Sequence, residues 1–186
     1  MEETLKQRDS KCIKIVLFGP ESTGKTVLAK QLAAHYNTLW VPEFSRIFAE
    51  EKAKKNESLT KADVLTIAKG QIALENALAK QVDRLLICDT NLLETKVYSK
   101  AYYQGYSPEI LNKYALENYY NLYFLTNIDI PWEFDGIRDK PHEREVMFNL
   151  FQDELINNNL PYVLLSGSFS KRLDTAIEHI DKLLKK

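Results

Sequence analysis

The sequence predicts an α/β fold in which a five-stranded parallel sheet carries helices on both faces. Five short apolar segments alternate with stretches that have the spacing of amphipathic helices, and this alternation is typical of parallel sheets. The first apolar segment runs into Gly19-Pro20-Glu21-Ser22-Thr23-Gly24-Lys25-Thr26, which has the pattern of a phosphate-binding P-loop. We therefore expect a P-loop NTPase or kinase fold, as one domain over residues 1–186.

The expected elements follow from where the apolar runs begin and stop. Residues 13–18 are mostly β-branched or aromatic and end at Gly19-Pro20, which is typical of a buried strand. Residues 1–12 are polar and charged, so we expect a flexible lead-in there. Further strands are predicted over 38–42, 85–90, 122–125 and 162–165. Helices are predicted from residue 24, over 43–55 and 60–82, in the tyrosine-rich stretch after residue 90, up to residue 118, over 143–157, and from residue 170 onward.

Composition excludes some partners and indicates a compartment. The chain has 25 basic and 26 acidic residues and a net charge of −1, so bulk electrostatics favours neither a nucleic-acid partner nor a membrane surface. Its two cysteines, Cys12 and Cys88, have no metal-site spacing and fit a reducing cytosol. No apolar run reaches the length of a membrane span or of a signal peptide, so we expect a cytoplasmic protein. The sequence leaves the oligomeric state open.

The P-loop predicts a site for a nucleoside triphosphate. Backbone N–H groups of such a loop, together with the dipole of the following helix, point at an anion. The glycines let the backbone approach the phosphates closely. Lys25 is the expected point charge for the β- and γ-phosphates, and the Thr26 hydroxyl is an expected Mg²⁺ ligand. The predicted triphosphate site consists of Gly19, Glu21, Ser22, Thr23, Gly24, Lys25, Thr26 and Val27.

Carboxylates that follow the predicted strands indicate where the rest of a site lies. Gly19, Glu43, Asp89 and Asp129 each come directly after a strand, and in parallel sheets such residues gather at one edge. Asp89 ends an apolar run, as a Walker B carboxylate does, and can hold Mg²⁺ or take part in catalysis. The alternative is that Asp89 only caps the following helix.

Two further polar residues have a functional and a structural interpretation each. Glu43 can hydrogen-bond a substrate hydroxyl or take its proton as a general base, with Arg46 one helical turn further on. A surface pair between Glu43 and Arg46 explains the same spacing. Gln71 falls on the apolar face of its predicted helix, where it binds substrate or is a core amide with its own partners.

The proline-bounded loop predicts a lid over residues 130–145. It contains Asp135 and Arg138, with Arg144 beyond them. Arginines that move over a bound triphosphate can stabilise the charge that develops in phosphoryl transfer. A solvated charged loop is the alternative.

Several of these motifs together resemble one family. GPESTGKT, WVPEFSR, Gly70-Gln71, Asp89-Thr90-Asn91 and DIPWEFDGIR at 129–138, in this order, resemble the nicotinamide riboside kinase domain of the NadR family. The resemblance runs from about residue 14 to the last helix. Proteins of that family also carry a DNA-binding domain and an adenylyltransferase domain before the kinase. Only residues 1–12 precede the first predicted strand here, so we expect neither of those domains.

The resemblance implies ATP-dependent phosphorylation of the 5′-hydroxyl of nicotinamide riboside, with Mg²⁺, to give nicotinamide mononucleotide. It implies Lys25, Asp89, Glu43 and Arg138 as catalytic residues, and Thr26 and Asp89 as metal ligands. Arg144, which lies in the predicted lid, is also expected at the ATP site. The implied acceptor-site residues are Trp40, Glu43, Arg46, Gln71, Asp89, Trp132 and Asp135. Nearby aromatic rings, those of Trp40, Tyr98, Tyr102 and Tyr103, are candidates to stack on a positively charged pyridinium.

Two other functions remain open from the sequence. One is a kinase for another nucleoside or a small alcohol. The other is a regulatory ATPase that phosphorylates no small molecule. The guanine-reading Asn-Lys-x-Asp pattern is missing, which disfavours a GTPase. Whether Glu43 or Asp89 is the general base is not separated by the sequence.

Overall fold

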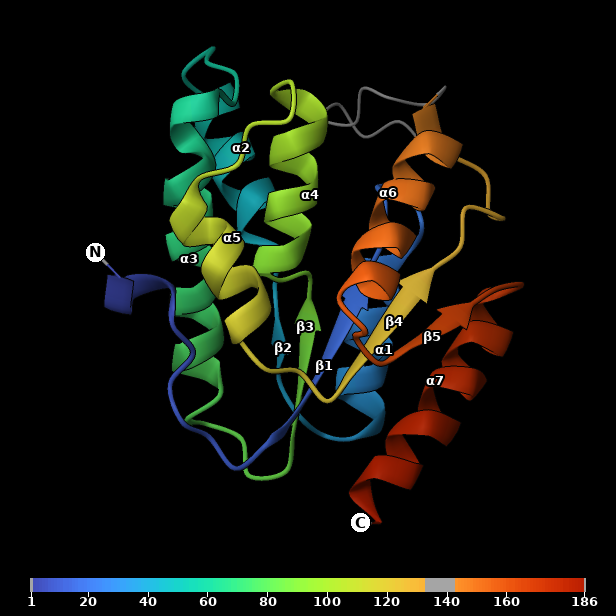
Figure 1. Cartoon of the computed structure of the whole chain (residues 1–186). Coiled ribbons are helices and arrows are strands. Elements are labelled where there is room, and N and C mark those ends of the chain that lie inside the picture. Colours follow the sequence, from blue (N-terminus) through green and yellow to red (C-terminus); the bar gives the residue numbers. More distant parts are fainter. Residues whose placement is uncertain (1, 133–142, 186) are drawn as a thin grey trace.

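The computed structural model describes residues 2–132 and 143–185. Within these residues, strands alternate with helices as predicted (Figure 1). The strands are β1 Ile13–Phe18, β2 Trp40–Val41, β3 Leu85–Asp89, β4 Leu122–Thr126 and β5 Tyr162–Leu165. The α-helices are α1 Lys25–His35, α2 Phe44–Ala53, α3 Val64–Leu78, α4 Leu92–Tyr102, α5 Glu109–Glu117, α6 Arg144–Asn157 and α7 Phe169–Leu184. Short 3₁₀ helices, η1 and η2, cover Glu2–Leu5 and Lys61–Asp63.

The strands form one parallel five-stranded sheet in the order β2-β3-β1-β4-β5, so the predicted fold class is confirmed. The P-loop strand β1 lies in the centre, and its Leu17 is in register with Asp89 of β3. Because all strands run the same way, their carboxyl ends share one edge, at the top of Figure 1. That edge carries the P-loop, Asp89 and Glu43.

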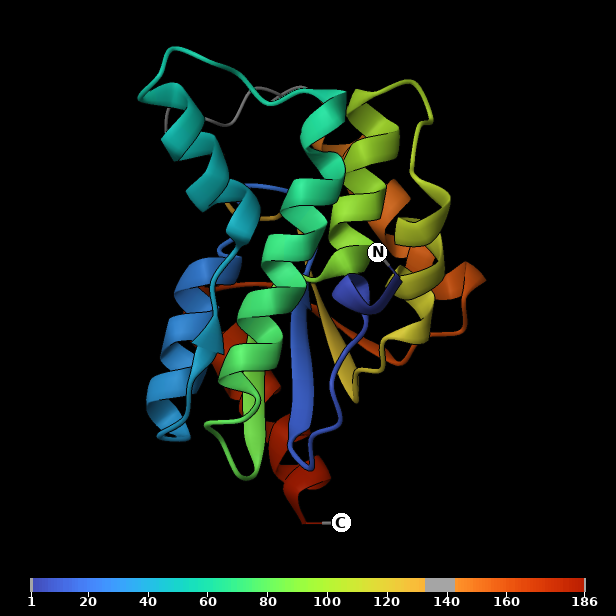
Figure 2. The same cartoon turned by 90° about the vertical axis from the view of Figure 1, so that its left-hand side faces the viewer.

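Helices cover both faces of the sheet, and each face has its own hydrophobic core. The larger core joins β1, β3 and β4 to α3, α4, α5 and α6 through side chains such as Val16, Phe18 and Phe151. The other core packs α1 and α7 against Ile15, Leu17 and the opposite side of the same strands. Figure 2 shows α1 on one side of β1 and α4 on the other. No helix in the described ranges is long and apolar enough to cross a membrane.

The segment expected to be a flexible lead-in is instead packed against α3 and α5, which corrects that prediction for residues 5–8 (Figure 2). The side chain of Leu5 is 0% exposed. Asn118 accepts a hydrogen bond from the Gln7 backbone N–H at 2.9 Å and donates one to the Leu5 carbonyl at 2.9 Å. Asn76 accepts from the backbone N–H of Arg8 at 2.8 Å. The polar composition misled because other side chains supply the hydrogen bonds of this segment.

Candidate active site

The P-loop has the backbone conformations that its glycines predict. Gly19 has φ 138° and Gly24, which caps α1, has φ 82°. A Cβ on Gly19 would lie 2.7 Å from Thr126 Oγ1 and 3.1 Å from the Thr126 carbonyl oxygen, so no larger residue fits there. Thr23 fixes the loop further, because its hydroxyl lies 2.7 Å from that of Thr126 and donates to the Pro20 carbonyl at 2.8 Å. The loop is therefore a rigid cradle between β1 and α1.

Lys25 and Thr26, the first residues of α1, point toward the loop and toward β3. The ammonium of Lys25 donates to the carbonyls of Gly19 and Pro20 at 2.6 and 2.9 Å and is 7% exposed. The Thr26 hydroxyl donates to Asp89 Oδ2 at 2.6 Å. Two predicted site residues from α1 and one from β3 are thus brought together.

Asp89 is a fully buried carboxylate at the carboxyl end of β3, with 0% exposure. Burial and the nearby charge of Glu43 raise its pKa to about 6, against the opposing influence of Lys25, the Thr26 hydroxyl and Arg46. Its Oδ1 has no hydrogen-bond partner among the described residues. A buried carboxylate with one unpaired oxygen is typical of a ligand-binding group and not of a helix cap.

The residues after Asp89 show that the cap is provided by another side chain. Asn91 is the N-cap of α4, because its Oδ1 accepts from the backbone N–H groups of Leu93 and Glu94. Its Nδ2 donates to the hydroxyl of Tyr123 at 3.0 Å. Between them Thr90 has φ 79°, which is strained for a β-branched residue. The capping alternative for Asp89 is therefore wrong, and the fixed turn aims Asp89 at the P-loop.

Glu43 and Arg46 lie on the far side of Asp89, at the start of α2. Glu43 is the N-cap residue of α2 and accepts a hydrogen bond from the Ser45 hydroxyl at 2.6 Å. Glu43 and Arg46 both act electrostatically on Asp89, so they share its environment. The sheet order places β2 and Glu43 one strand further from the P-loop than Asp89.

Gln71 supports this turn with both ends of its amide. Its Oε1 accepts from the Phe44 backbone N–H at 2.8 Å, and its Nε2 donates to the Pro42 carbonyl at 3.3 Å. It is 2% exposed. The structural interpretation of Gln71 is thus the one observed, and its effect is to hold the turn that presents Glu43.

The aromatic candidates divide between the two faces of the sheet. Trp40 packs in the core on the α1 side, with the ammonium of Lys30 5.3 Å from its ring centroid. The structure therefore does not bring Trp40 to the other site residues. Tyr98 lies on α4 and its hydroxyl is influenced by Glu94 and Glu43, which, after burial, raise its pKa. Tyr98 therefore lies within electrostatic reach of these carboxylates, and its ring packs against Phe151.

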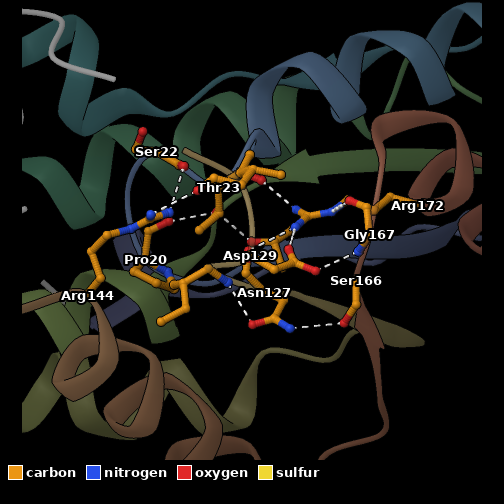
Figure 3. A network of polar contacts seen from close by, with 12 residues as sticks. Pro20, Ser22, Thr23, Asn127, Asp129, Arg144, Ser166, Gly167 and Arg172 are labelled. Carbon is orange, nitrogen blue, oxygen red and sulfur yellow. Dashed lines mark hydrogen bonds and ion pairs between the residues drawn. The ribbon is translucent and has the colours of Figure 1, made fainter. Parts of the chain in front are cut away.

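Arg144, the first residue of α6, reaches back to the P-loop from the other side. It donates to the Ile130 carbonyl at 2.9 Å and to the Ser22 carbonyl at 3.3 Å (Figure 3). Burial and the neighbouring Arg172 lower its pKa. Of the other predicted residues, Val27 is exposed, and Glu21 and Trp132 are half-buried. Asp135 and Arg138, with most of the expected lid, lie outside the described residues.

Arg172 is a residue that the sequence analysis did not single out. Its guanidinium, 1% exposed, donates to the carbonyls of Thr23 and Gly167 at 2.8 and 3.0 Å and pairs with Asp129 (Figure 3). Asp129 also accepts from the Gly167 backbone N–H at 2.6 Å. Asp129 lies at the carboxyl edge of the sheet, as expected, but it pairs with Arg172 and anchors the β4 side of the P-loop. An arginine in the first turn of a helix gives no sequence signal for such a role.

Glu94 is the second residue that was missed. It lies in the first turn of α4, 2% exposed, with Oε1 3.3 Å from the Lys25 ammonium. Burial raises its pKa well above the usual range, and Lys25 opposes the shift. The available signal was its spacing. Glu94 comes three positions after the N-cap Asn91, in the first helical turn after the strand that ends at Asp89.

The donor set fits a magnesium ion. Mg²⁺ prefers hard oxygen ligands and keeps several waters and phosphate oxygens in its shell, so few protein ligands are needed. The Thr26 hydroxyl and the carboxylate of Asp89, with its free buried Oδ1, supply such oxygens. A cluster of three or more His, Cys, Asp or Glu side chains, as an all-protein metal site needs, does not occur among the described residues.

Comparison with known proteins decides the family. Residues 14–172 match the model of a protein family described as AAA domain. The chain belongs to this family. A curated relative of the AAA-domain chain is the "Trifunctional NAD biosynthesis/regulator protein NadR" of Salmonella typhimurium, 26% identical over 174 residues. The alignment covers 91% of this chain and 42% of NadR, so the chain spans less than half of that relative.

Solved structures show the same fold. NadR protein in complex with NR matches the AAA-domain chain with a TM-score of 0.78 and 20% identity, covering 94% of this chain and 52% of that chain. NadR in complex with NAD and AMP-PNP matches with a TM-score of 0.75 and 19% identity, covering 94% and 50%. Thymidylate kinase from Candida albicans matches with a TM-score of 0.65 and 16% identity, covering 96% and 94%. The resemblance to NadR and the P-loop kinase fold are confirmed.

Proposed function

We propose that this AAA-domain chain is an ATP-dependent kinase that phosphorylates the 5′-hydroxyl of nicotinamide riboside to give nicotinamide mononucleotide. The observation that supports it most is the arrangement of Thr26 and Lys25 around Asp89, at the carboxyl edge of β1 and β3. The similarity to NadR, solved in complex with NR, supports the choice of acceptor.

The reaction forms one P–O bond and breaks another. The 5′-oxygen of the riboside attacks the γ-phosphorus, the bond to the bridging oxygen breaks, and ADP leaves with the bonding electrons. The proton of the hydroxyl passes to a carboxylate. Lys25 and the backbone N–H groups of the P-loop hold the phosphates, which is most of what a protein does in this reaction.

Thr26 and Asp89 are the residues that would hold Mg²⁺, which when bound neutralises charge on the phosphate oxygens. Asp89 lies beside the P-loop strand, and Glu43 lies one strand further out, where an acceptor beyond the γ-phosphate would be placed. We therefore assign the metal and the proton to Asp89 and the riboside hydroxyls to Glu43. Gln71 orients Glu43 through the turn between β2 and α2.

The direct test is product formation from ATP and nicotinamide riboside, followed by ³¹P NMR and by separation of nicotinamide mononucleotide. A panel of deoxyadenosine, thymidine, cytidine and adenosine serves as the comparison. Specificity constants at least tenfold in favour of nicotinamide riboside are the expected result; the factor corresponds to about 1.4 kcal/mol.

The panel separates the two rival functions. Faster phosphorylation of another nucleoside would favour a kinase of different specificity. Thymidylate kinase, which has the same fold, is an example of a kinase with another acceptor. Steady ATP hydrolysis that no nucleoside changes would favour a regulatory ATPase. Thermal shift gives independent support, because a ligand at 100 times its dissociation constant stabilises by about 2.7 kcal/mol.

A further inference from the structure

Glu94 is a buried carboxylate beside the P-loop that the proposed reaction does not use. Its Oε1 lies 3.3 Å from the ammonium of Lys25, and the residue is 2% exposed. Apart from this contact with Lys25, neither of its oxygens accepts a hydrogen bond from the part of the chain that the structure describes. Buried carboxylates are nearly always hydrogen-bonded, so the charge of Glu94 depends on Lys25 for its stabilisation.

Another buried glutamate in the same molecule shows what a structural ion pair looks like. Glu75, 1% exposed, accepts from Lys14 at 3.0 Å, from Gln7 at 2.7 Å and from Tyr120 at 2.7 Å. Both of its oxygens are satisfied. Glu94 has the same burial and the same type of partner but none of these hydrogen bonds. The contrast indicates that Glu94 contributes less than Glu75 to the stability of the fold.

The start of α4 does not require the Glu94 side chain either. A glutamate three residues after an N-cap often accepts from the backbone N–H of the cap residue, forming a capping box. Here the Asn91 side chain alone accepts from the backbone N–H groups of Leu93 and Glu94. The Glu94 carboxylate turns instead toward Lys25. Its position is explained by the P-loop lysine and not by its own helix.

Lys25 is held by three oxygens on the inner side of the loop. Its ammonium donates to the carbonyls of Gly19 and Pro20 at 2.6 and 2.9 Å, and Glu94 supplies the negative charge beside them. A P-loop lysine that binds a triphosphate directs its ammonium at the β- and γ-phosphates. The triphosphate and Glu94 are therefore two anions that can each pair with the ammonium of Lys25.

We propose that Glu94 is a positioning residue that holds Lys25 inside the P-loop and competes with the triphosphate for its ammonium. The inference rests on the triphosphate site of the proposed function and not on the identity of the acceptor. The charge of Glu94 lowers the affinity for the triphosphate in two ways. The negative charge of Glu94 holds Lys25 back, and it repels the incoming phosphates.

The test is calorimetric titration of the parent and of Glu94→Gln with AMP-PNP in the presence of Mg²⁺. Glutamine keeps the shape of the side chain and removes its charge, so AMP-PNP should bind at least about threefold more tightly to the variant. Adenosine, which has no phosphates to reach Lys25, should bind equally to both. Glu75→Gln is the matched control, because it removes the charge of an equally buried, lysine-paired glutamate remote from the loop.

The outcomes separate this inference from the proposed function. Unchanged or weaker binding of AMP-PNP to Glu94→Gln, with binding to the parent intact, overturns the inference alone. Equal tightening in Glu75→Gln overturns it as well, because the effect would then be a general one of net charge. A parent that binds no AMP-PNP overturns the triphosphate site and the inference with it. If Glu94→Gln does not fold, Glu94→Asp, which keeps the charge but moves it away from Lys25, should bind AMP-PNP more tightly than the parent.

Discussion

The hydroxyl of Thr26 donates a 2.6 Å hydrogen bond to Oδ2 of Asp89, which joins the first turn of α1 to the carboxyl end of β3. The second oxygen of this carboxylate is buried and has no partner among the described residues. A hydroxyl and a carboxylate held together in this way offer hard oxygens on one side of a phosphate-binding loop. Asp89 is therefore the centre around which the other site residues are arranged.

The first prediction separates Asp89 from Glu43. Asp89→Asn should lower the turnover number at least about 100-fold, the usual contribution of a general base, and should change the Mg²⁺ dependence of the rate. Glu43→Gln should chiefly raise the Michaelis constant for the riboside and leave the Mg²⁺ response unchanged. The expected loss is roughly 1.5–3 kcal/mol, as for a hydrogen bond to a charged acceptor.

Initial rates over a Mg²⁺ titration, at saturating ATP and riboside, provide the measurement for both variants. An altered Mg²⁺ response in Glu43→Gln, or parental behaviour of Asp89→Asn, would show that the two roles are reversed.

The second prediction concerns pH and stability. The pKa of Asp89 is raised from 3.8 to about 6, because burial and Glu43 disfavour its charged form. A raised carboxyl pKa stabilises the fold below the unfolded pKa, and this stabilisation is lost as pH rises through the folded pKa. Asp89→Asn removes the charge and should be more stable than the parent at pH 7.5 by roughly 3 kcal/mol, the equivalent of about two pKa units. The gain should shrink toward pH 4.

Thermal unfolding of both proteins between pH 4 and 8, without nucleotide or Mg²⁺, measures this difference. Glu43→Gln is a useful third protein, because loss of the Glu43 charge lowers the pKa of Asp89 and moves the pH dependence to lower pH. A stability difference that does not change with pH would contradict the prediction.

The third prediction concerns Lys25. Lys25→Ala should reduce kinase activity far more than tenfold, because the charge of a P-loop lysine neutralises β- and γ-phosphate oxygens during phosphoryl transfer. The variant should also be less stable than the parent at neutral pH, because Glu94 would be left buried without its cation. Adding Glu94→Gln should restore stability but not activity. Activity of Lys25→Ala within tenfold of the parent is the result that contradicts the assignment.

The sequence predicted the sheet and the centre of the site for physical reasons that can be named. Strands buried on both faces appear as short apolar runs, and a P-loop requires Gly19 and Gly24 at positive φ, so both leave strong local patterns. The observed order β2-β3-β1 places Asp89 beside the loop. Asp89, Thr26, Lys25 and Glu43 were therefore found together as expected.

Residues whose role depends on distant contacts were not predictable in this way. Trp40 and Val41 are adjacent, and only the pairing of β2 decides that Trp40 faces α1 and not the site. Arg172 contacts Thr23 of the P-loop from 149 positions further along the chain. Glu94 is an ordinary helix residue until Lys25 is placed against it. Each of these contacts is set by tertiary packing, which leaves no periodic signal in the chain.

The fourth prediction concerns Arg172, which links the P-loop to the loops after β4 and β5. Arg172→Lys keeps the charge but cannot reach Thr23, Gly167 and Asp129 at once, because lysine lacks the planar fork of donors. The free energy of unfolding should fall by roughly 3 kcal/mol, as expected when one or two hydrogen bonds of a charged donor are lost. AMP-PNP should bind more weakly, because the Thr23 carbonyl loses its anchor.

Chemical denaturation and calorimetric titration test the two effects. Lys171→Ala, at the exposed neighbouring position, is the control and should change neither. An Arg172→Lys variant that binds AMP-PNP as tightly as the parent would show that the network supports the fold but not the loop.

The fifth prediction tests whether residues 5–8 belong to the folded domain. Leu5 is 0% exposed and packs in the core shared by β1, α3 and α5, so Leu5→Ala should lower the free energy of unfolding by about 2–4 kcal/mol, as large-to-small substitutions in cores do. Lys6→Ala changes an exposed side chain at the next position and should stay within about 0.5 kcal/mol of the parent. Urea unfolding of the three proteins gives the comparison. Equal stability of Leu5→Ala and Lys6→Ala would mean that the segment is a loose lead-in after all, and that the bonds from Asn76 and Asn118 do not hold it in solution.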